Sequence, residues 1–235
     1  NTAVGGASLS AVTTADNNVA VGYLASNAIT TGGNNVSVGS YAMDAATTSQ
    51  DNIAIGIAAM GNINHANSNN NIAIGSYAGD GMGTLDGNAN NLFIGSNAGG
   101  GSWTTAASSY NVGIGNNSMD AAMNAADNNT AVGYDAGTDL TEGDSCTLIG
   151  ANAGANITTA DKNVCVGESA GYYQVTGDNN TYIGNSAGQG ATGQSNSGNV
   201  GIGKDALVSI TDGTNNVAVG MGAGDSITTG DYNVF

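Results

Sequence analysis

The sequence predicts an all-β protein, a parallel β-solenoid of thirteen coils that each take about 17 residues. A Gly recurs every 17 to 20 residues along the whole chain, and Val or Ile directly precedes each of these glycines. Asn stands four residues before all of them except one, where Cys146 takes its place. Residues 1–235 therefore form a single repetitive domain. We call the recurring residues the anchor glycines: Gly5, Gly22, Gly39, Gly56, Gly75, Gly95, Gly115, Gly133, Gly150, Gly167, Gly184, Gly203 and Gly220.

The residues before each anchor glycine predict a short strand. Val19 and Val21 lie on one face of this strand and Ala20 on the other, because successive side chains alternate. Gly22 then ends the strand, at a bend or close backbone approach that excludes a Cβ. We expect the residues before the anchor glycines to form one continuous internal column, which includes Val21, Val38, Ile55 and Ile74.

After the corner, Ala25 opens a second limb, which we expect to be a weaker strand packed closely on the first. Residues 30–34 (TTGGN) carry turn chemistry and predict a polar loop that leads to the next coil. The Asn column is expected to be structural, because stacked amides hydrogen-bond along the stack. It begins with Asn18, Asn35, Asn52 and Asn71. A coil cannot bury its own apolar face, so stability comes from its neighbours.

Composition excludes several classes of protein. With 39 Gly and no Pro the chain is not collagen, and 9% charged against 40% hydrophobic residues argues against disorder. Two Lys, no Arg and 18 acids give a net charge of -16, so nucleic acid and anionic membrane surfaces are implausible partners. No hydrophobic run is long enough to span a bilayer. This balance favours an extracellular setting.

Residues 18–22 (NVAVG), 52–56 (NIAIG) and 71–75 (NIAIG) resemble the N-S-V-A-I-G head repeat of trimeric autotransporter adhesins. The longer period, with Thr-Thr-Gly and Asn-Asn in the loop, is also similar to repeats of phage tail fibres. The resemblance implies a left-handed β-roll in which three chains associate side by side as a homotrimer. The other strand face is also apolar, which favours burial against another limb or another chain: Ala20, Ala54, Ala73, Phe93, Leu148, Cys165 and Tyr182.

Few residues in the chain carry catalytic chemistry. His65 is the single His, and two Cys and one His lie too far apart in sequence for a zinc site. Paired carboxylates could cleave glycosides, but the acids recur with the repeat and stand mostly in turns. We therefore expect no enzyme. Cys146 and Cys165 fall one coil apart and two residues out of register, so we expect two buried thiols rather than a disulfide.

Four acids stand six residues before successive anchor glycines and should stack in a column: Asp127, Asp144, Asp161 and Asp178. Stacked carboxylates repel each other. Either solvent and salt screen them, which we favour, or Ca²⁺ binds between them. We expect no other cofactor.

The coils between Gly56 and Gly133 are longer, with two, three, three and one residues beyond 17. Insertions in solenoids gather on one face, which is often the binding face. The inserted loops contain His65, Met82, Leu85 and Trp103, the only Trp. Trp103 either stacks on a ligand or covers the apolar edge of a neighbouring coil or chain.

These features predict an extracellular structural fibre or adhesin shaft that projects and attaches to a surface or a host-cell receptor. A phage tail-fibre shaft is the alternative within the same class. An ice-binding solenoid is a third hypothesis, based on recurring Thr pairs at Thr13–Thr14, Thr30–Thr31, Thr47–Thr48, Thr104–Thr105, Thr158–Thr159 and Thr228–Thr229. Because the chain begins and ends inside a repeat, we expect it to be a segment of a longer fibre.

Overall fold

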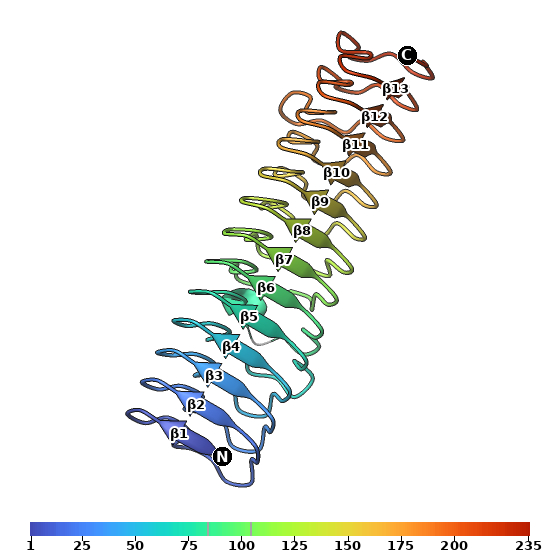
Figure 1. Cartoon of the computed structure of the whole chain (residues 1–235). Coiled ribbons are helices and arrows are strands. Elements are labelled where there is room, and N and C mark those ends of the chain that lie inside the picture. Colours follow the sequence, from blue (N-terminus) through green and yellow to red (C-terminus); the bar gives the residue numbers. More distant parts are fainter. Residues whose placement is uncertain (84, 104) are drawn as a thin grey trace. The chain divides into compact units, whose positions relative to one another are not determined.

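The computed structural model describes residues 1–83, 85–103 and 105–235, and the chain forms two compact units, Asn1–Ala125 and Ala126–Phe235. Each unit is a parallel β-solenoid with one three-residue strand per coil (Figure 1), which confirms the predicted fold class. The first unit contains β1 (Thr2–Val4), β2 (Val19–Val21), β3 (Val36–Val38), β4 (Ile53–Ile55), β5 (Ile72–Ile74), β6 (Leu92–Ile94) and β7 (Val112–Ile114). The second contains β8 (Thr130–Val132), β9 (Thr147–Ile149), β10 (Val164–Val166), β11 (Thr181–Ile183), β12 (Val200–Ile202) and β13 (Val217–Val219).

Within each unit, every strand pairs in parallel with the strand of the next coil and in the register of the repeat. In β4 and β5, for example, Ala54 lies beside Ala73 and Ile55 beside Ile74. The longer coils keep this register, because their additional residues lie in the loops and leave the strands aligned. Equivalent residues of successive coils therefore form continuous columns.

The interior column is formed by the middle residues of β2 to β13, and our expectation for their neighbours was wrong. Ala54 and Ala73 are completely buried, whereas Ile55 and Ile74 are 38% and 37% exposed. The residues expected inside thus lie on the outer face, with three exposed and one half-buried: Val21, Ile55, Ile74 and Val38. Successive side chains of a strand alternate between its two faces, so the middle residue enters the interior and the two residues beside it turn outward.

The apolar middle residues are buried within their own chain. Ala20, Phe93, Leu148, Cys165 and Tyr182 are each 0% exposed. Of the two alternatives for this face, burial against another limb of the same chain is correct. The face therefore gives no support to a partner chain.

Large residues in the interior column are accommodated by glycine in the next coil. Phe93 is followed in register by Gly113, where a Cβ would lie 2.8 Å from the Phe93 ring. Tyr182 is followed by Gly201, where a Cβ would lie 3.2 Å from the Tyr182 ring. The Tyr182 hydroxyl donates a hydrogen bond to Asn196 Oδ1 at 2.5 Å, which satisfies its only buried polar atom. A large side chain in one coil is thus compensated by the missing side chain of glycine in the next, which keeps the interior closely packed.

The anchor glycines turn the chain at the end of each strand, as predicted. Gly56 has a φ of +141°, a backbone conformation that residues other than glycine rarely adopt. A Cβ on Gly56 would lie 2.2 Å from the carbonyl oxygen of Gly75 in the next coil. Backbone conformation and close stacking therefore both require glycine at this position in the repeat.

The second limb is a series of turns, so the expectation of a weaker strand was wrong. Positive φ values recur at every second residue, such as 61° at Tyr41 and 51° at Met43. The amide of Tyr41 donates to Tyr23 O in the preceding coil, and that of Met43 to Ala59 O in the following coil. Because the limb bonds alternately to the two neighbouring coils, its backbone bends at each residue and does not extend.

The predicted Asn column is confirmed. Asn52 Oδ1 accepts the backbone amide of Asn71 at 2.9 Å and its side-chain amide at 3.2 Å. Asn71 Nδ2 also donates to the carbonyl of Asn88 at 2.8 Å. The same pattern joins Asn18 to Asn35 and Asn35 to Asn52. These side chains are buried and link each strand to the loop beneath it, so their role is structural.

Candidate functional site

The first candidate surface is the outer strand face, which we define as the first and third residues of strands β1 to β13. All of these residues are Val, Ile, Leu or Thr, and no strand contains a charged residue. Val19, Val21, Val217 and Val219 are at least 36% exposed, so the side chains are accessible to a partner. The third residue of every strand is Val or Ile, so a chain with a net charge of -16 has an uncharged apolar column along each unit.

Exposed aromatic residues extend this surface beyond the corner in the first unit. Tyr23, Tyr41 and Tyr77 are 54%, 42% and 48% exposed, and Ile57 is 54% exposed. The rings of Tyr23 and Tyr41 meet edge-on with centroids 5.5 Å apart. Tyr is frequent in protein interfaces, because it combines a large apolar ring with a polar hydroxyl.

The predicted Asp column forms, and its carboxylates accept backbone hydrogen bonds. Asp144 Oδ1 accepts the amide of Asp127 at 2.7 Å, and Asp161 Oδ1 accepts the amide of Asp144 at 2.8 Å. Asp178 Oδ1 in turn accepts the amide of Asp161 at 2.8 Å. Each bond offsets part of the repulsion between the stacked charges. Among the described residues, no three or more His, Cys, Asp or Glu side chains come together to bind a metal ion.

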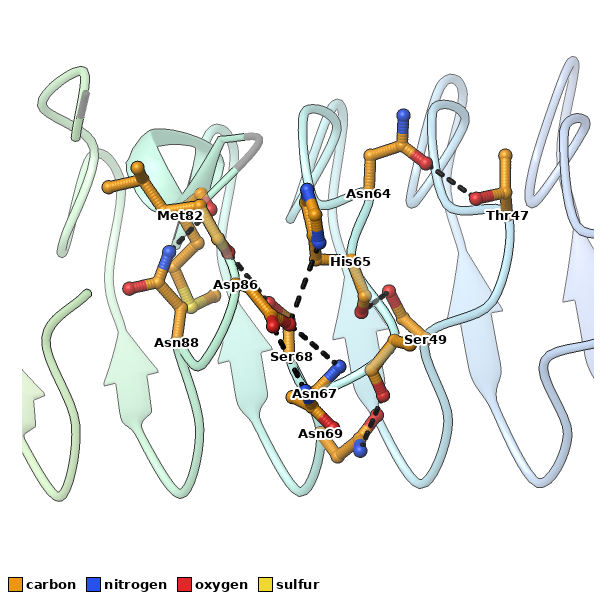
Figure 2. A network of polar contacts seen from close by, with 12 residues as sticks. Thr47, Ser49, Asn64, His65, Asn67, Ser68, Asn69, Met82, Asp86 and Asn88 are labelled. Atoms are coloured by element: carbon orange, nitrogen blue, oxygen red, sulfur yellow. Dashed lines mark hydrogen bonds and ion pairs between the residues drawn. The ribbon is translucent and has the colours of Figure 1, made fainter. Parts of the chain in front are cut away.

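The loops of the longer coils are joined by polar contacts, which Figure 2 shows. His65 Nδ1 lies 3.5 Å from Asp86 Oδ1, and Asn67 Nδ2 donates to Asp86 Oδ2 at 3.0 Å. Asn88 Nδ2 donates to the carbonyl of Met82 at 2.7 Å. His65 therefore lies at the surface, 45% exposed in its side chain, and contacts the next loop.

The other predicted loop residues have different surroundings. Met82 ends the short 3₁₀ helix η1 (Asp80–Met82) and is completely buried, and Leu85 is half-buried. Trp103 is 1% exposed and packs edge-on against Phe93, with ring centroids 5.8 Å apart. The hypothesis that Trp103 stacks on a ligand from an exposed loop is thus wrong. Its ring covers the apolar interior of its own chain, as the alternative proposed.

A pocket of about 290 Å³ lies over these loops. Its lining residues come from four successive coils of the first unit: Ala45, Asn62, Asn64, Asp80, Gly81, Gly83, Ser102 and Trp103. Asn62 Nδ2 donates to Asp80 Oδ1 at 3.0 Å and so positions the carboxylate. Burial raises the pKa of Asp80 above its usual value, and the nearby charge of Asp44 adds to this effect. Hydrogen bonds from the backbone amides of Asn62 and Gly61 oppose the rise in pKa.

Sequence reasoning selected Trp103 and missed Asp80, Asn62 and Asn64 as its neighbours. A signal was present in the fifth residue after each anchor glycine, which in the coils of the first unit from Gly39 onward alternates between Asp and Gly. These residues are Asp44, Gly61, Asp80, Gly100 and Asp120. A Cβ on Gly61 would lie 2.9 Å from Asp80 Oδ1, so the glycine makes room for the carboxylate of the next coil.

The two cysteines are free and buried, as predicted. Cys146 Sγ donates to the carbonyl of Ala160 at 3.2 Å, and Asn129 Oδ1 accepts the backbone amide of Cys146 at 2.8 Å. Burial raises the pKa of the Cys146 thiol to about 11 and that of Cys165 still further. Both thiols are therefore protonated and unreactive near neutral pH.

Threonine hydroxyls in the loops form hydrogen bonds between stacked coils. Thr13 Oγ1 donates to the carbonyl of Thr30 at 2.9 Å, and Thr141 Oγ1 to that of Thr158 at 3.1 Å. Thr30 Oγ1 donates to the carbonyl of Thr47 at 3.2 Å. Thr104 lies outside the described residues. The hydroxyls of Thr13, Thr30 and Thr141 therefore bind the backbone of a neighbouring coil and help to hold the stack together.

The sequence matches no protein-family model, and no characterised protein is significantly similar to it. Among the described residues, no helix has the length and apolar character needed to cross a membrane.

Proposed function

We propose that this chain is a structural segment of an extracellular fibre, in which three copies associate side by side through their outer strand faces. The observation that carries the proposal is the uncharged, exposed Val and Ile column on each unit. Apolar stripes of this kind are uncommon on soluble monomers and are typical of interfaces.

A second copy of the same chain fits this surface better than an unrelated partner. It presents Val and Ile columns with the same coil spacing, so side chains of one copy pack between those of another along the fibre. The 18 acids lie outside the strands, so chains of high negative charge meet along their neutral faces. Three copies, as in the adhesin heads that the repeat resembles, turn all three faces towards a common axis.

The role proposed is projection and attachment, with no catalysis. An adhesin shaft and a phage tail-fibre shaft have the same physical requirements. Each must be a soluble, protease-resistant rod that attaches to a surface or host-cell receptor. Two Lys and no Arg leave few sites for trypsin-like proteases, and the high negative charge maintains solubility.

The test is the mass of the chain in solution, measured by light scattering for the wild type and for Ile55→Asp/Ile74→Asp. We expect a trimer for the wild type and a folded monomer for the variant, because both side chains are already exposed in the single chain. Circular dichroism checks that the variant retains its β structure. Gln50→Asp, at an exposed loop residue, adds charge away from the strand face and should remain trimeric.

Two results would overturn the proposal. The first is a monomeric wild type at micromolar concentration. The second is a variant that keeps the trimer mass, which would place the interface on a different surface.

A further inference from the structure

The outer strand face has two ends in each coil. We define the leading end as the fifth residue before the anchor glycine and the trailing end as the first residue after it. In the coil of β10 these residues are Lys162 and Glu168, and both are exposed. This is the only coil with a charged residue at each end, and the two charges are opposite.

The charge of Lys162 is not neutralised by an ion pair within its own chain. Among the described residues, the basic groups in ion pairs are those of His65 and Lys204. Glu168 Oε2 accepts from Asn185 Nδ2 at 3.2 Å, which uses one of the approximately four acceptor sites of a carboxylate. The three residues of β10 separate Lys162 from Glu168 by about 10 Å of strand. Both charges are therefore available to a partner.

The Asp column lies beside Lys162, but its carboxylates are bound to the backbone. The amide of Lys162 donates to the carbonyl of Asp144 at 2.8 Å. Asp161 Oδ1 accepts the amide of Asp144, and Asp178 Oδ1 accepts the amide of Asp161, both at 2.8 Å. No ion pair joins Lys162 to this column among the described residues.

Aromatic residues at the two ends vary together. The coil of β8 has Asn128 at its leading end and Tyr134 at its trailing end. The coil of β7 has the reverse arrangement, with Tyr110 at its leading end and Asn116 at its trailing end. Tyr110 and Tyr134 are 60% and 55% exposed. Such an exchange, which keeps one ring and one amide in each coil, is expected where a leading end contacts a trailing end.

A cyclic trimer brings a leading end and a trailing end together. In a closed ring each copy contacts its two neighbours through two different patches. When the outer strand faces turn towards a common axis, the strands of one coil run in the same sense around it. The trailing end of one copy then lies beside the leading end of the next copy, in the same coil, because a rotation relates the copies.

We propose that Lys162 of each copy forms an ion pair with Glu168 of the next copy and so fixes the register of the chains. The inference rests on the proposed trimer and names residues that align its copies. The Val and Ile columns recur in every coil, so the apolar contacts are similar after a shift of one coil. An ion pair present in a single coil is lost by such a shift, and complementary charges can therefore fix register.

Charge reversal tests the pair. Light scattering over a range of concentrations gives the dissociation constant of the trimer for each chain. Lys162→Glu and Glu168→Lys each place like charges at three contacts, so each should raise this constant by about 3- to 100-fold. Lys162→Glu/Glu168→Lys restores opposite charges at every contact and should return the constant to within about twofold of the wild type.

Lys204→Glu is the matched control. It makes the same change of charge at a trailing end, but the leading end of that coil is the uncharged Gly198. Lys204 also lies 3.4 Å from Asp205 in its own chain, so its reversal should leave the dissociation constant of the trimer unchanged. Circular dichroism checks that every variant is folded. At about 1 M salt, where charges are screened beyond about 3 Å, the difference between Lys162→Glu and the wild type should vanish.

A carbodiimide detects the pair in the wild-type chain, because it joins an amine to a carboxylate in contact with it, with loss of water. Denaturing gels should show covalent dimers and trimers for the wild type and far fewer for Lys162→Glu. Mass spectrometry should identify Lys162 linked to Glu168. Trimers reassembled from isotope-labelled and unlabelled chains then show that the link joins different copies.

A trimer whose dissociation constant is unchanged by either single reversal, or is not restored in the double variant, overturns the pairing alone. Links from Lys162 that reach only Asp144, Asp161 or Asp178 of the same chain also overturn it, because they assign the cation to the Asp column. A monomeric wild type overturns the proposed trimer and the pairing with it.

Discussion

Replacing Gly75 with Ala should destabilise the solenoid by about 2 to 6 kcal/mol. Gly75 has a φ of +142°, and holding a residue with a side chain in such a conformation costs about 1 to 3 kcal/mol. The new Cβ would also lie 2.3 Å from the carbonyl oxygen of Gly95. The backbone of one coil must then move, which costs about another 1 to 3 kcal/mol by analogy with overpacked cores.

Thermal unfolding followed by circular dichroism measures this effect, and about 1 kcal/mol corresponds to a shift in Tm of roughly 2 to 4 °C in a chain of this size. Gly5→Ala and Gly220→Ala separate the two causes, because both glycines have a φ of +135°. A Cβ on Gly5 would lie 2.4 Å from Gly22 O, whereas one on Gly220 meets no atom within 4 Å. Equal destabilisation by Gly75→Ala, Gly5→Ala and Gly220→Ala would refute the close stacking of the coils.

Three further outcomes are expected. Asn71→Ala should cost about 1 to 3 kcal/mol per buried group left unpaired, because the amide of Asn91 loses its acceptor, and denaturant unfolding measures the loss. Burial raises the pKa of Asp80, so ionisation of this carboxyl group destabilises the fold. The contribution of protonated Asp80 to folding stability is therefore fully present below pH 3.8 and is lost as the pH rises through the raised pKa. Asp80→Asn should therefore be more stable than wild type at neutral pH, with the advantage vanishing in acid; an advantage independent of pH would contradict this cause. Cys146 should react with an aromatic disulfide reagent only after denaturation, and rapid reaction of the native chain at neutral pH would disprove its burial.

Asp80 shows how a functional candidate arises at the expense of stability. A half-buried carboxylate with a raised pKa is unfavourable for the fold, yet the pocket has one beside an unpaired indole donor. Binding sites commonly retain groups that a purely structural protein would replace. The pH dependence of the stability of Asp80→Asn tests this cost directly.

The sequence by itself determined the repeat, its one strand per coil, and the Gly and Asn columns. The Gly column was predictable because only glycine tolerates the φ of +141° at Gly56 together with a backbone oxygen 2.2 Å from a Cβ. The Asn column was predictable because one side-chain amide can bond the coils on both sides, as Asn52 does by donating to Asn35 and accepting from Asn71. These requirements are local and recur in every coil, so they leave a periodic record in the sequence.

Only the tertiary structure decided which side of each strand is inside and which loop residues meet. Ala73 and Ile74 are both apolar, and hydrophobicity alone favoured Ile74 for the interior. The coil instead buries Ala73 completely and leaves Ile74 on the outer face, and the same inward position holds residues as large as Phe93 and Tyr182. Trp103 and Asp80 are separated by 23 residues, and their meeting at one pocket depends on inserted loops that follow no period. Packing volume and loop paths are properties of the assembled coils, which is why a repeat sequence specifies the columns but not the faces or the pocket.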